Sequence, residues 1–197
     1  MKRKLLLGTN NEDKVKEIKD ILKEIDLDIK TLTDLKIKIE VVEDRDSLEG
    51  NALKKAEEMW KKAKMPCTAD DTGLFVDALE GAPGIFAARY AGKDASYSDN
   101  RKKLLRNLEG IPLMSRTAYF RTVACYYYAK GKYKLFEGIC EGKILFEERG
   151  KDGFGYDAVF LPNGYDKTFA EIDTEEKSRI SHRAKAFDKF KEYLLDQ

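Results

Sequence analysis

Three runs rich in aromatic and β-branched residues, in the second half of the chain, constrain its fold more than any other feature. The runs cover residues 116–129, 132–140 and 142–148 and are broken by glycines. Such runs with short breaks predict an antiparallel meander. The first half instead alternates short apolar runs with segments whose apolar residues recur at helical spacing. Because strand–helix units and a meander share one chain, we expect an α/β fold with a mixed sheet.

Hydrophobic periodicity predicts the other elements. Strands are expected over residues 3–8, 28–33, 36–42, 67–69 and 157–161. Helices are expected after segments 9–14, 46–47 and 96–98, and from about Ser181 to near the C-terminus. In residues 36–42 apolar and polar side chains alternate, which is typical of a sheet with one wet face. No repeat or Pro/Ser-rich linker interrupts the chain, so residues 1–197 are expected to form a single domain, with one core or two closely joined lobes.

Charge and cysteine content narrow the class of protein. Lys and Arg total 37 against 36 Asp and Glu, so the formal net charge is +1, whereas general nucleic-acid-binding proteins usually carry a marked basic excess. The N-terminal apolar run ends after three leucines, which is too short for a signal peptide or a membrane span. The 3 cysteines lack metal-type spacing and are expected to be reduced core residues. We expect a cytoplasmic protein that binds neither nucleic acid nor a membrane.

The segment Thr9–Lys14 is a candidate phosphate site. It lies between a predicted strand and a predicted helix, and a helix start offers unpaired N–H groups and partial positive charge. Asn11 can donate from its amide, and Lys14 adds a full positive charge. The segment lacks the glycines and the Lys-Ser/Thr ending of a Walker loop. The competing interpretation is a surface helix capped by an asparagine, with an ordinary solvated lysine.

The adjacent acids Asp70 and Asp71 form a candidate metal site. They follow a short apolar strand and precede Thr72 and Gly73. Magnesium at phosphate-binding sites takes one or two carboxylates and keeps several waters. Neighbouring residues on a strand point to opposite faces, so one acid is expected to face the site and the other to brace a loop. The competing interpretation is a simple turn, for which these residue types are suitable.

Two further segments carry aromatic or basic side chains suited to a nucleotide. Gly153–Asp157, with the sequence GFGYD, combines a closely approachable backbone with rings that can stack on a base; alternatively, it is a turn whose rings fill the core. Glu176–Arg183 approaches the last helix and contains His182, the one histidine of the chain. Lys177, His182 and Arg183 could contact a phosphate and a base edge, or serve as a structural cap and solvated cations.

These segments, in this order, resemble the inosine triphosphate pyrophosphatase family, also called the XTP/dITP diphosphatases. The resemblance runs from about residue 4 to residue 194. It is carried by Thr9–Lys14, ADDTG at 69–73, GAPGIFAARYAG at 81–92, GFGYD at 153–157 and KSRISHRA at 177–184. It implies a two-lobed α/β fold around a long mixed sheet flanked by helices, with a nucleotide cleft between the lobes. It also implies a homodimer, for which the aromatic stretch 119–128 is expected to offer apolar surface.

The resemblance further implies an activity and assigns residues to it. The activity is Mg²⁺-dependent hydrolysis of non-standard purine nucleoside triphosphates (ITP, dITP, XTP) to the nucleoside monophosphate and pyrophosphate, a house-cleaning of the nucleotide pool. Asp71 falls on the proton acceptor, which is also a metal-site residue, and Glu43 falls on the second metal ligand, with Glu40 as its alternative. The expected substrate-binding positions are Thr9, Asn10, Asn11, Glu12, Asp13, Lys14, Thr72, Phe154, Gly155, Tyr156, Asp157, Lys177, His182 and Arg183.

Selection of the base is expected to depend on Lys177 and Arg183. Both carry only hydrogen-bond donors, so they can bond O6 of hypoxanthine or xanthine but would face the 6-amino group of adenine donor to donor. Two residues depart from the family pattern: Asn10 stands where relatives often have Gly, and Gly50 where they often have Glu. The alternatives are a Maf-like nucleotide pyrophosphatase with another base preference, a catalytically silent nucleotide sensor, and a structural or RNA-binding module.

Overall fold

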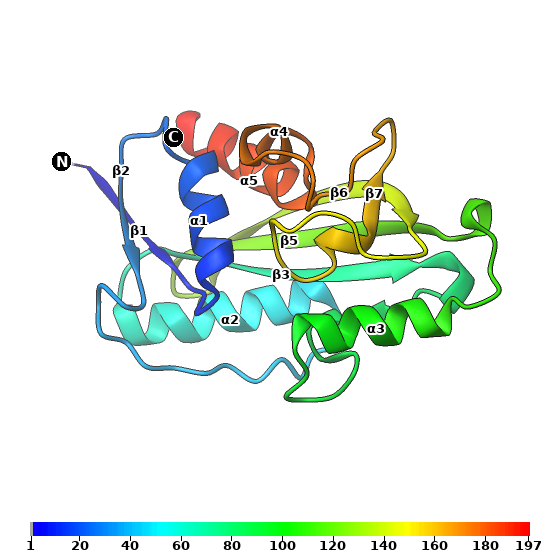
Figure 1. Cartoon of the computed structure of the whole chain (residues 1–197). Coiled ribbons are helices and arrows are strands. Elements are labelled where there is room, and N and C mark those ends of the chain that lie inside the picture. Colours follow the sequence, from blue (N-terminus) through cyan, green and yellow to red (C-terminus); the bar gives the residue numbers. More distant parts are fainter. Residues whose placement is uncertain (1) are drawn as a thin grey trace. The chain divides into compact units, whose positions relative to one another are not determined.

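The computed structural model describes residues 2–197, and the predicted mixed α/β fold is confirmed. The strands are β1 (Arg3–Leu7), β2 (Leu27–Thr31), β3 (Cys67–Val76), β4 (Pro83–Gly84), β5 (Thr117–Ala129), β6 (Lys132–Ile144) and β7 (Phe160–Pro162). The α-helices are α1 (Glu12–Ile21), α2 (Leu48–Ala63), α3 (Tyr97–Asn107), α4 (Thr174–Ile180) and α5 (His182–Leu195). The strands form one sheet in the order β2-β1-β3-β5-β6-β7, and β4 pairs with β3. Figure 1 shows these elements along the chain.

The chain divides into two compact units, and each is described by itself. The first unit comprises the described residues through Asp71, together with Thr122–Gly138 and His182–Gln197. The second comprises Thr72–Arg121 and Ile139–Ser181. Within residues 2–197, no helix combines the length and the apolar character needed to cross a membrane.

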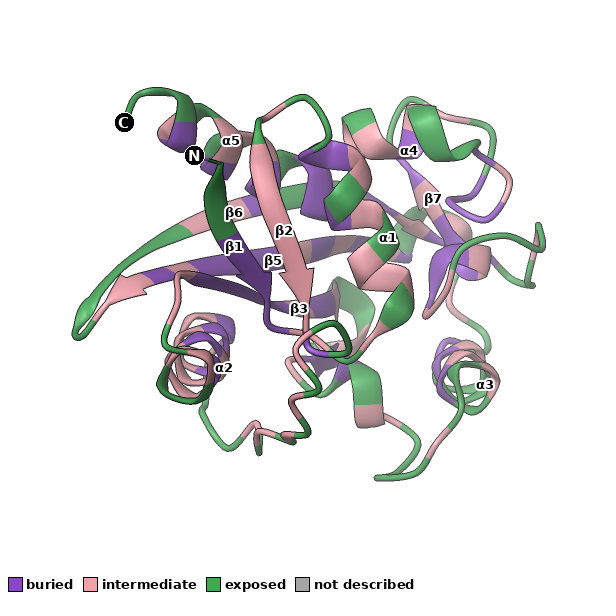
Figure 2. Cartoon of the chain, turned by 90° about the vertical axis from the view of Figure 1, so that its left-hand side faces the viewer, coloured by how far each residue is buried: buried purple, intermediate pink, exposed green. Residues whose placement is uncertain are grey.

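The first unit packs helices against both faces of its strands. Strand β1 pairs in parallel with both β2 and β3. Leu5 and Leu7 of β1 pack in a cluster with α1 and α5, whereas Leu6 packs in another cluster with Met59 of α2, because successive strand residues point to opposite faces. Figure 1 shows α1 and α5 on one side of β1 and α2 on the other. In Figure 2, α2 is seen nearly end-on, with its buried residues on one face of the helix.

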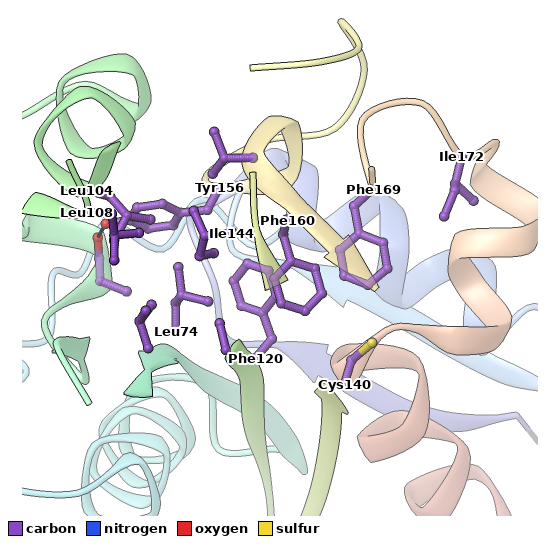
Figure 3. Packing of buried hydrophobic residues seen from close by; sticks show 14 residues of the cluster. Leu74, Leu104, Leu108, Phe120, Cys140, Ile144, Tyr156, Phe160, Phe169 and Ile172 are labelled. Carbon is purple, nitrogen blue, oxygen red and sulfur yellow. Dashed lines mark hydrogen bonds between the residues drawn. The ribbon is translucent and has the colours of Figure 1, made fainter. Parts of the chain in front are cut away.

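An aromatic core holds the second unit together. The rings of Phe120, Phe160 and Phe169 contact one another, with Phe160 4.7 Å from Phe120 and 5.1 Å from Phe169 between ring centroids, and Phe120 6.1 Å from Phe169. Leu104 of α3 and Leu108, the residue that caps the end of this helix, belong to the same cluster (Figure 3). Helix α3 begins with a capping box, since the hydroxyl of Ser96 accepts from the third helical N–H and the carboxylate there accepts in return. Because the leucines of α3 recur at helical spacing, they lie on one face of the helix and pack against the aromatic residues of this cluster.

Several predicted strand boundaries are wrong. Residues 36–42 form no strand, although Ile37, Ile39 and Val41 are half-buried and the polar residues between them are exposed, as alternation predicts. Strand β3 does not stop at residue 69 but continues through Asp70–Gly73, so the simple-turn interpretation of these residues is also wrong. Residues 157–161 form a short 3₁₀ turn, Asp157–Val159, followed by β7.

Two glycines explain why the sequence predicts two short strands where the structure has the single strand β6. Residues 132–140 and 142–148 were expected as two strands, whereas β6 runs unbroken to Ile144. A Cβ on Gly142 would lie 2.3 Å from the carbonyl oxygen of Leu161, and one on Gly138 would lie 2.0 Å from that of His182. Both glycines thus permit a close approach of a neighbouring segment, of β7 and α5 respectively, and do not mark a turn.

Candidate active site

The segment between β1 and α1 is a capped helix start that also carries a buried cation. The Oδ1 of Asn11 accepts from the backbone N–H groups of Asp13 (2.9 Å) and Lys14 (3.2 Å), and the Oγ1 of Thr9 accepts from the N–H of Asn11 (3.1 Å). The side chain of Lys14 is only 16% exposed and its ammonium lies 2.9 Å from Asp70. The surface-helix interpretation is therefore correct about the asparagine cap. It is wrong about Lys14, which is not a solvated lysine.

Asp70 lies at the centre of a buried charge cluster in the first unit. Its Oδ2 accepts from Lys14 and from Arg183 of α5, whose Nη2 is 3.2 Å away. The Nη1 of Arg183 binds Glu17 of α1 at 2.6 Å. The side chains of Asp70 and Arg183 are 0% and 2% exposed. This cluster ties β3 to the helices on one face of the sheet.

Asp71 is turned the other way, toward α2. Its Oδ1 lies 2.8 Å from the ammonium of Lys55, which also lies 2.8 Å from Oε1 of Glu43. Its Oδ2 accepts from the amide of the fully buried Asn51 at 3.2 Å. The expectation that the two acids face opposite ways is thus confirmed. Asp70, however, braces helices and not a loop.

Burial and neighbouring charges give the two acids opposite pKa shifts. Burial would raise the pKa of Asp70, but the charges of Lys14 and Arg183 hold that pKa well below its usual range. Burial raises the pKa of Asp71; Glu43 adds to this and Lys55 opposes it. A carboxylate with a raised pKa is a better proton acceptor at neutral pH than an ordinary one. Asp71 therefore has the chemistry of a general base, and Asp70 that of a fixed anion.

The donor set around Asp71 suits a magnesium ion. Within residues 2–197, no group of three or more His, Cys, Asp or Glu side chains converges on a point. Glu43 and Asp71 nevertheless share one cation, the ammonium of Lys55. Magnesium at phosphate sites needs one or two carboxylates, with waters and substrate oxygens completing its shell. Two carboxylates that already converge on one cation therefore fit Mg²⁺. The alternative ligand Glu40 is exposed and instead lines a pocket of about 760 Å³ with Asn10.

Sequence reasoning missed two residues of this cluster, Asn51 and Lys55. They occupy the first unit's α2 four residues apart, and so lie on one side of that helix. Leu48, Ala52 and other apolar residues make that helix face buried. An amide and an ammonium at core-facing positions are unusual. This was the signal that could have identified them.

In the second unit, Asp157 organises the GFGYD segment. Its Oδ2 accepts from the backbone N–H of Phe154 at 2.8 Å and from the ammonium of Lys177 at 2.7 Å. The same ammonium lies 5.1 Å from the centroid of the Phe154 ring. Gly153 has φ = 73°, and a Cβ there would lie 2.3 Å from Oδ2 of Asp157. The half-buried ring of Phe154 therefore lies beside the ammonium of Lys177, which Asp157 holds in place.

Tyr156 and Gly155 serve this segment differently from Phe154. The Tyr156 side chain is buried in the aromatic core, and its hydroxyl donates to the carbonyl of Ala87 at 2.8 Å. The carbonyl of Gly155 accepts from Arg101 at 2.8 Å. The interpretation of the segment as a turn with a core-filling ring is therefore correct for Tyr156.

The remaining predicted site residues are placed as follows. Glu12 is exposed and Asp13 half-buried in the first turn of α1, and the amide of Asn10 donates to the carbonyl of Ile39 at 2.9 Å. Thr72 is half-buried on β3 beside Asp71. Lys177 lies on α4, whereas the buried His182 begins α5, because Ser181 between them is extended with ψ = 156°. The single helix predicted from about Ser181 is thus preceded by a separate helix.

Comparisons with known proteins give a consistent result over nearly the whole chain. A model of the Ham1 family matches residues 5–193. A dITP/XTP pyrophosphatase of Thermoanaerobacter sp. (strain X514) is 47% identical over 192 residues, covering 98% of this chain and 96% of that protein. A dITP/XTP pyrophosphatase of Porphyromonas gingivalis (strain ATCC BAA-308 / W83) is 46% identical over 192 residues, covering 98% and 97%.

Solved structures resemble the fold equally closely. A HAM1 protein from Coxiella burnetii superposes with a TM-score of 0.89 and 32% identity, covering 99% of this chain and 100% of that one. The Staphylococcus aureus Ham1 protein gives a TM-score of 0.86 and 34% identity, covering 98% and 99%. The likeness therefore extends over both units of this chain.

Proposed function

The chain belongs to the Ham1 family, and we propose on that premise that it hydrolyses non-standard purine nucleoside triphosphates to the monophosphate and pyrophosphate. Relatives more than 40% identical over almost their full length are dITP/XTP pyrophosphatases, which supports ITP, dITP and XTP as its substrates. The observation that carries the proposal is the pair of lysine–carboxylate clusters on β3. They combine a proton acceptor with cations suited to phosphate.

The first unit supplies the groups for phosphate chemistry. Lys14 and Lys55 are fixed by Asp70 and Asp71, so their charges are in place before a triphosphate arrives, which is how preorganised electrostatic stabilisation works. Asp71 would accept a proton from a water molecule while the oxygen of that water forms a bond to the α-phosphorus. The bond from that phosphorus to the bridging oxygen then breaks, and pyrophosphate leaves with the bond electrons.

Glu43 and Asp71 would hold a magnesium ion. When bound, such an ion supplies charge neutralisation and polarisation of phosphate oxygens. Lys55 binds both of these carboxylates and so keeps them close together. We expect Glu43→Gln to raise the Mg²⁺ concentration needed for half-maximal activity, and to weaken Mn²⁺ binding measured by electron paramagnetic resonance without substrate.

The second unit supplies groups suited to a purine. The half-buried ring of Phe154 offers a stacking surface, and base–aromatic stacking is tolerant of base identity. Lys177, beside this ring, can donate to O6 but not to a 6-amino group. A buried polar mismatch of this kind costs about 1–3 kcal/mol per unsatisfied group, so selection would depend on Lys177 more than on stacking.

The three cysteines of the described chain are free and buried, which supports a location in the reducing cytoplasm, where the nucleotide pool lies. The homodimer implied by the family resemblance is part of the same proposal.

The experiment that tests this function is a pyrophosphate-release assay. The purified chain is incubated with ITP, XTP, dITP, GTP and ATP, each with and without Mg²⁺. We expect release from the first three, dependent on the metal, and little from ATP. Tight nucleotide binding without release would instead indicate a sensor, and release chiefly from canonical nucleotides would indicate another base preference.

A further inference from the structure

The amide of Asn51 binds two parts of the first unit that lie apart in the sequence. Its Nδ2 donates to Oδ2 of Asp71 on β3 at 3.2 Å, and its Oδ1 accepts from the backbone N–H of Arg45 at 3.0 Å. Asn51 lies near the start of α2 and is fully buried. Reversing the amide would place its oxygen against the carboxylate and its NH₂ against the N–H, so only one orientation satisfies both bonds. Asn51 therefore holds Arg45 and Asp71 at a fixed separation.

The bond to Arg45 also fixes the segment that carries Glu43. The carboxylate of Glu43 binds Lys55 at 2.8 Å, and the backbone bond to Asn51 lies two residues further along the chain. Lys55 is itself a cation, so a metal ion bound by Glu43 and Asp71 would repel it. Asn51 is neutral and can keep both of its contacts when such an ion binds. Its amide therefore holds the two acids beside one another independently of Lys55.

Gly50 permits the close approach of Arg45 to α2. A Cβ at position 50 would lie 2.8 Å from Cβ of Arg45 and 3.1 Å from Oγ of Ser47. The first distance is too short for two carbon atoms that are not bonded, so a side chain here would push Arg45 away from the helix. The contact between Arg45 and Asn51 thus depends on a glycine in the first turn of α2, although alanine has the higher helix propensity.

We propose that Asn51 is a positioning residue that holds Glu43 and Asp71 ready for a magnesium ion, and that Gly50 allows it to do so. The proposal rests on the proposed function, which assigns the metal to these two acids. Ligands that are held together in advance lose less conformational freedom when the ion binds. Removing a group that orients metal ligands typically lowers metal affinity or activity by about 10–100-fold.

The test is Mn²⁺ binding without substrate, measured by electron paramagnetic resonance for wild type and Asn51→Ala. The variant should bind as many ions per chain as wild type, with a dissociation constant about tenfold higher. The Mg²⁺ concentration for half-maximal activity on ITP should rise by a similar factor. At saturating Mg²⁺ kcat should fall less, because the bound ion then draws the two acids together. A folding defect would instead lower the number of ions bound per chain and leave the dissociation constant unchanged.

Asn100→Ala is the matched control. Asn100 is also a buried asparagine on a helix, and its amide likewise binds two groups, the N–H of Ala91 at 2.7 Å and the carbonyl of Ala88 at 3.1 Å. Its replacement removes the same kind of buried amide from the second unit. The control should therefore be destabilised, whereas its dissociation constant for Mn²⁺ should equal that of wild type.

Gly50→Ala tests the same contact without changing Asn51, and replaces Asn51→Ala if that variant does not fold. The added methyl group should displace Arg45 and break its bond to the amide. We expect weaker Mn²⁺ binding in a protein with normal circular dichroism.

The outcomes separate the positioning role from the proposed function. A wild-type protein that releases no pyrophosphate from any purine nucleoside triphosphate contradicts the proposed function. An active wild type that binds no Mn²⁺ without substrate contradicts only the positioning role, since ligands held together in advance should bind the ion by themselves. Wild-type Mn²⁺ affinity in Asn51→Ala (or in Gly50→Ala, in the case above) would also overturn it, as would an equal loss in Asn100→Ala.

Discussion

At the scale of single residues, Asp70 and Asp71 share a strand but differ in their surroundings. Asp70 has two cations close to one oxygen, whereas Asp71 shares Lys55 with a second acid, Glu43. Burial raises the pKa of Asp71, whereas the charges of Lys14 and Arg183 outweigh burial at Asp70 and hold its pKa below the usual range. The strand geometry that turns successive residues to opposite faces is what separates the two roles.

Replacing Asp71 by Asn should abolish most activity. The change keeps the shape of the side chain but removes the proton acceptor, so pyrophosphate release from ITP should fall by about 10²-fold or more. Asp44→Asn is the matched control, because Asp44 is an exposed acid paired with Lys54. Turnover in Asp71→Asn equal to that of the control would refute the assignment.

The low pKa of Asp70 predicts how stability depends on pH. A carboxyl whose pKa is lower in the folded than in the unfolded chain stabilises the fold above the unfolded value, about 3.9, and loses this contribution as pH falls toward the folded value. At neutral pH, Asp70→Asn should lower the free energy of unfolding by about 1–3 kcal/mol. Urea titrations followed by circular dichroism should show this difference shrinking below about pH 4. A difference independent of pH would mean that Asp70 is not an ion-paired carboxylate.

At the scale of elements, glycines in β6 decide how closely other segments pack. A Cβ at Gly138 would lie 2.0 Å from the carbonyl of His182 and 2.5 Å from the N–H nitrogen of Ala186, both backbone atoms of α5. Backbone cannot move aside as a flexible side chain can. The start of α5, which carries Arg183, therefore depends on this glycine.

Gly138→Ala should destabilise the protein by about 1–3 kcal/mol, as overpacking usually does. The midpoint of urea unfolding is the measurement, with Lys132→Ala on the exposed end of the same strand as the control. A variant as stable as the control would show that α5 can shift at little cost.

Elements with strong periodicity were predictable from the sequence, whereas contacts between distant segments were not. The leucine stripe of α3 and the alternation in residues 36–42 are local patterns, and both are seen. Whether residues 36–42 pair with a strand depends on a neighbour, and there is none for them in the described sheet. Gly138 and Gly142 look like strand breaks in the sequence, because the segments that pack closely against them lie far away in the chain.

In the candidate site, too, the residues in local motifs were predictable, whereas their long-range partners were not. Asp71, Lys14 and Glu43 were predicted and lie in the two clusters on β3. Lys55 was missed because its partners are 12 and 16 residues away. The carboxylate partners of Arg183 were also unforeseen, since Asp70 is 113 residues distant.

At the scale of the whole molecule, the surface of the proposed homodimer stays a prediction. In the aromatic stretch 119–128 no residue is fully exposed, but Tyr119, Tyr126 and Tyr128 are half-buried and keep part of their rings accessible. The ring of Tyr126 packs on Phe190, and that of Tyr127 on Trp60. Light scattering should still give about twice the 22.6 kDa chain mass; a monomer at tens of micromolar protein would contradict the dimer.

The central claim is that water attacks the α-phosphorus of a non-standard purine nucleoside triphosphate. Hydrolysis of ITP in H₂¹⁸O tests it most directly, because the label marks the phosphorus that water attacked. We predict IMP and pyrophosphate as the first products, with ¹⁸O in the phosphate of IMP by mass spectrometry. Label in pyrophosphate, or IDP and orthophosphate as first products, would contradict the account.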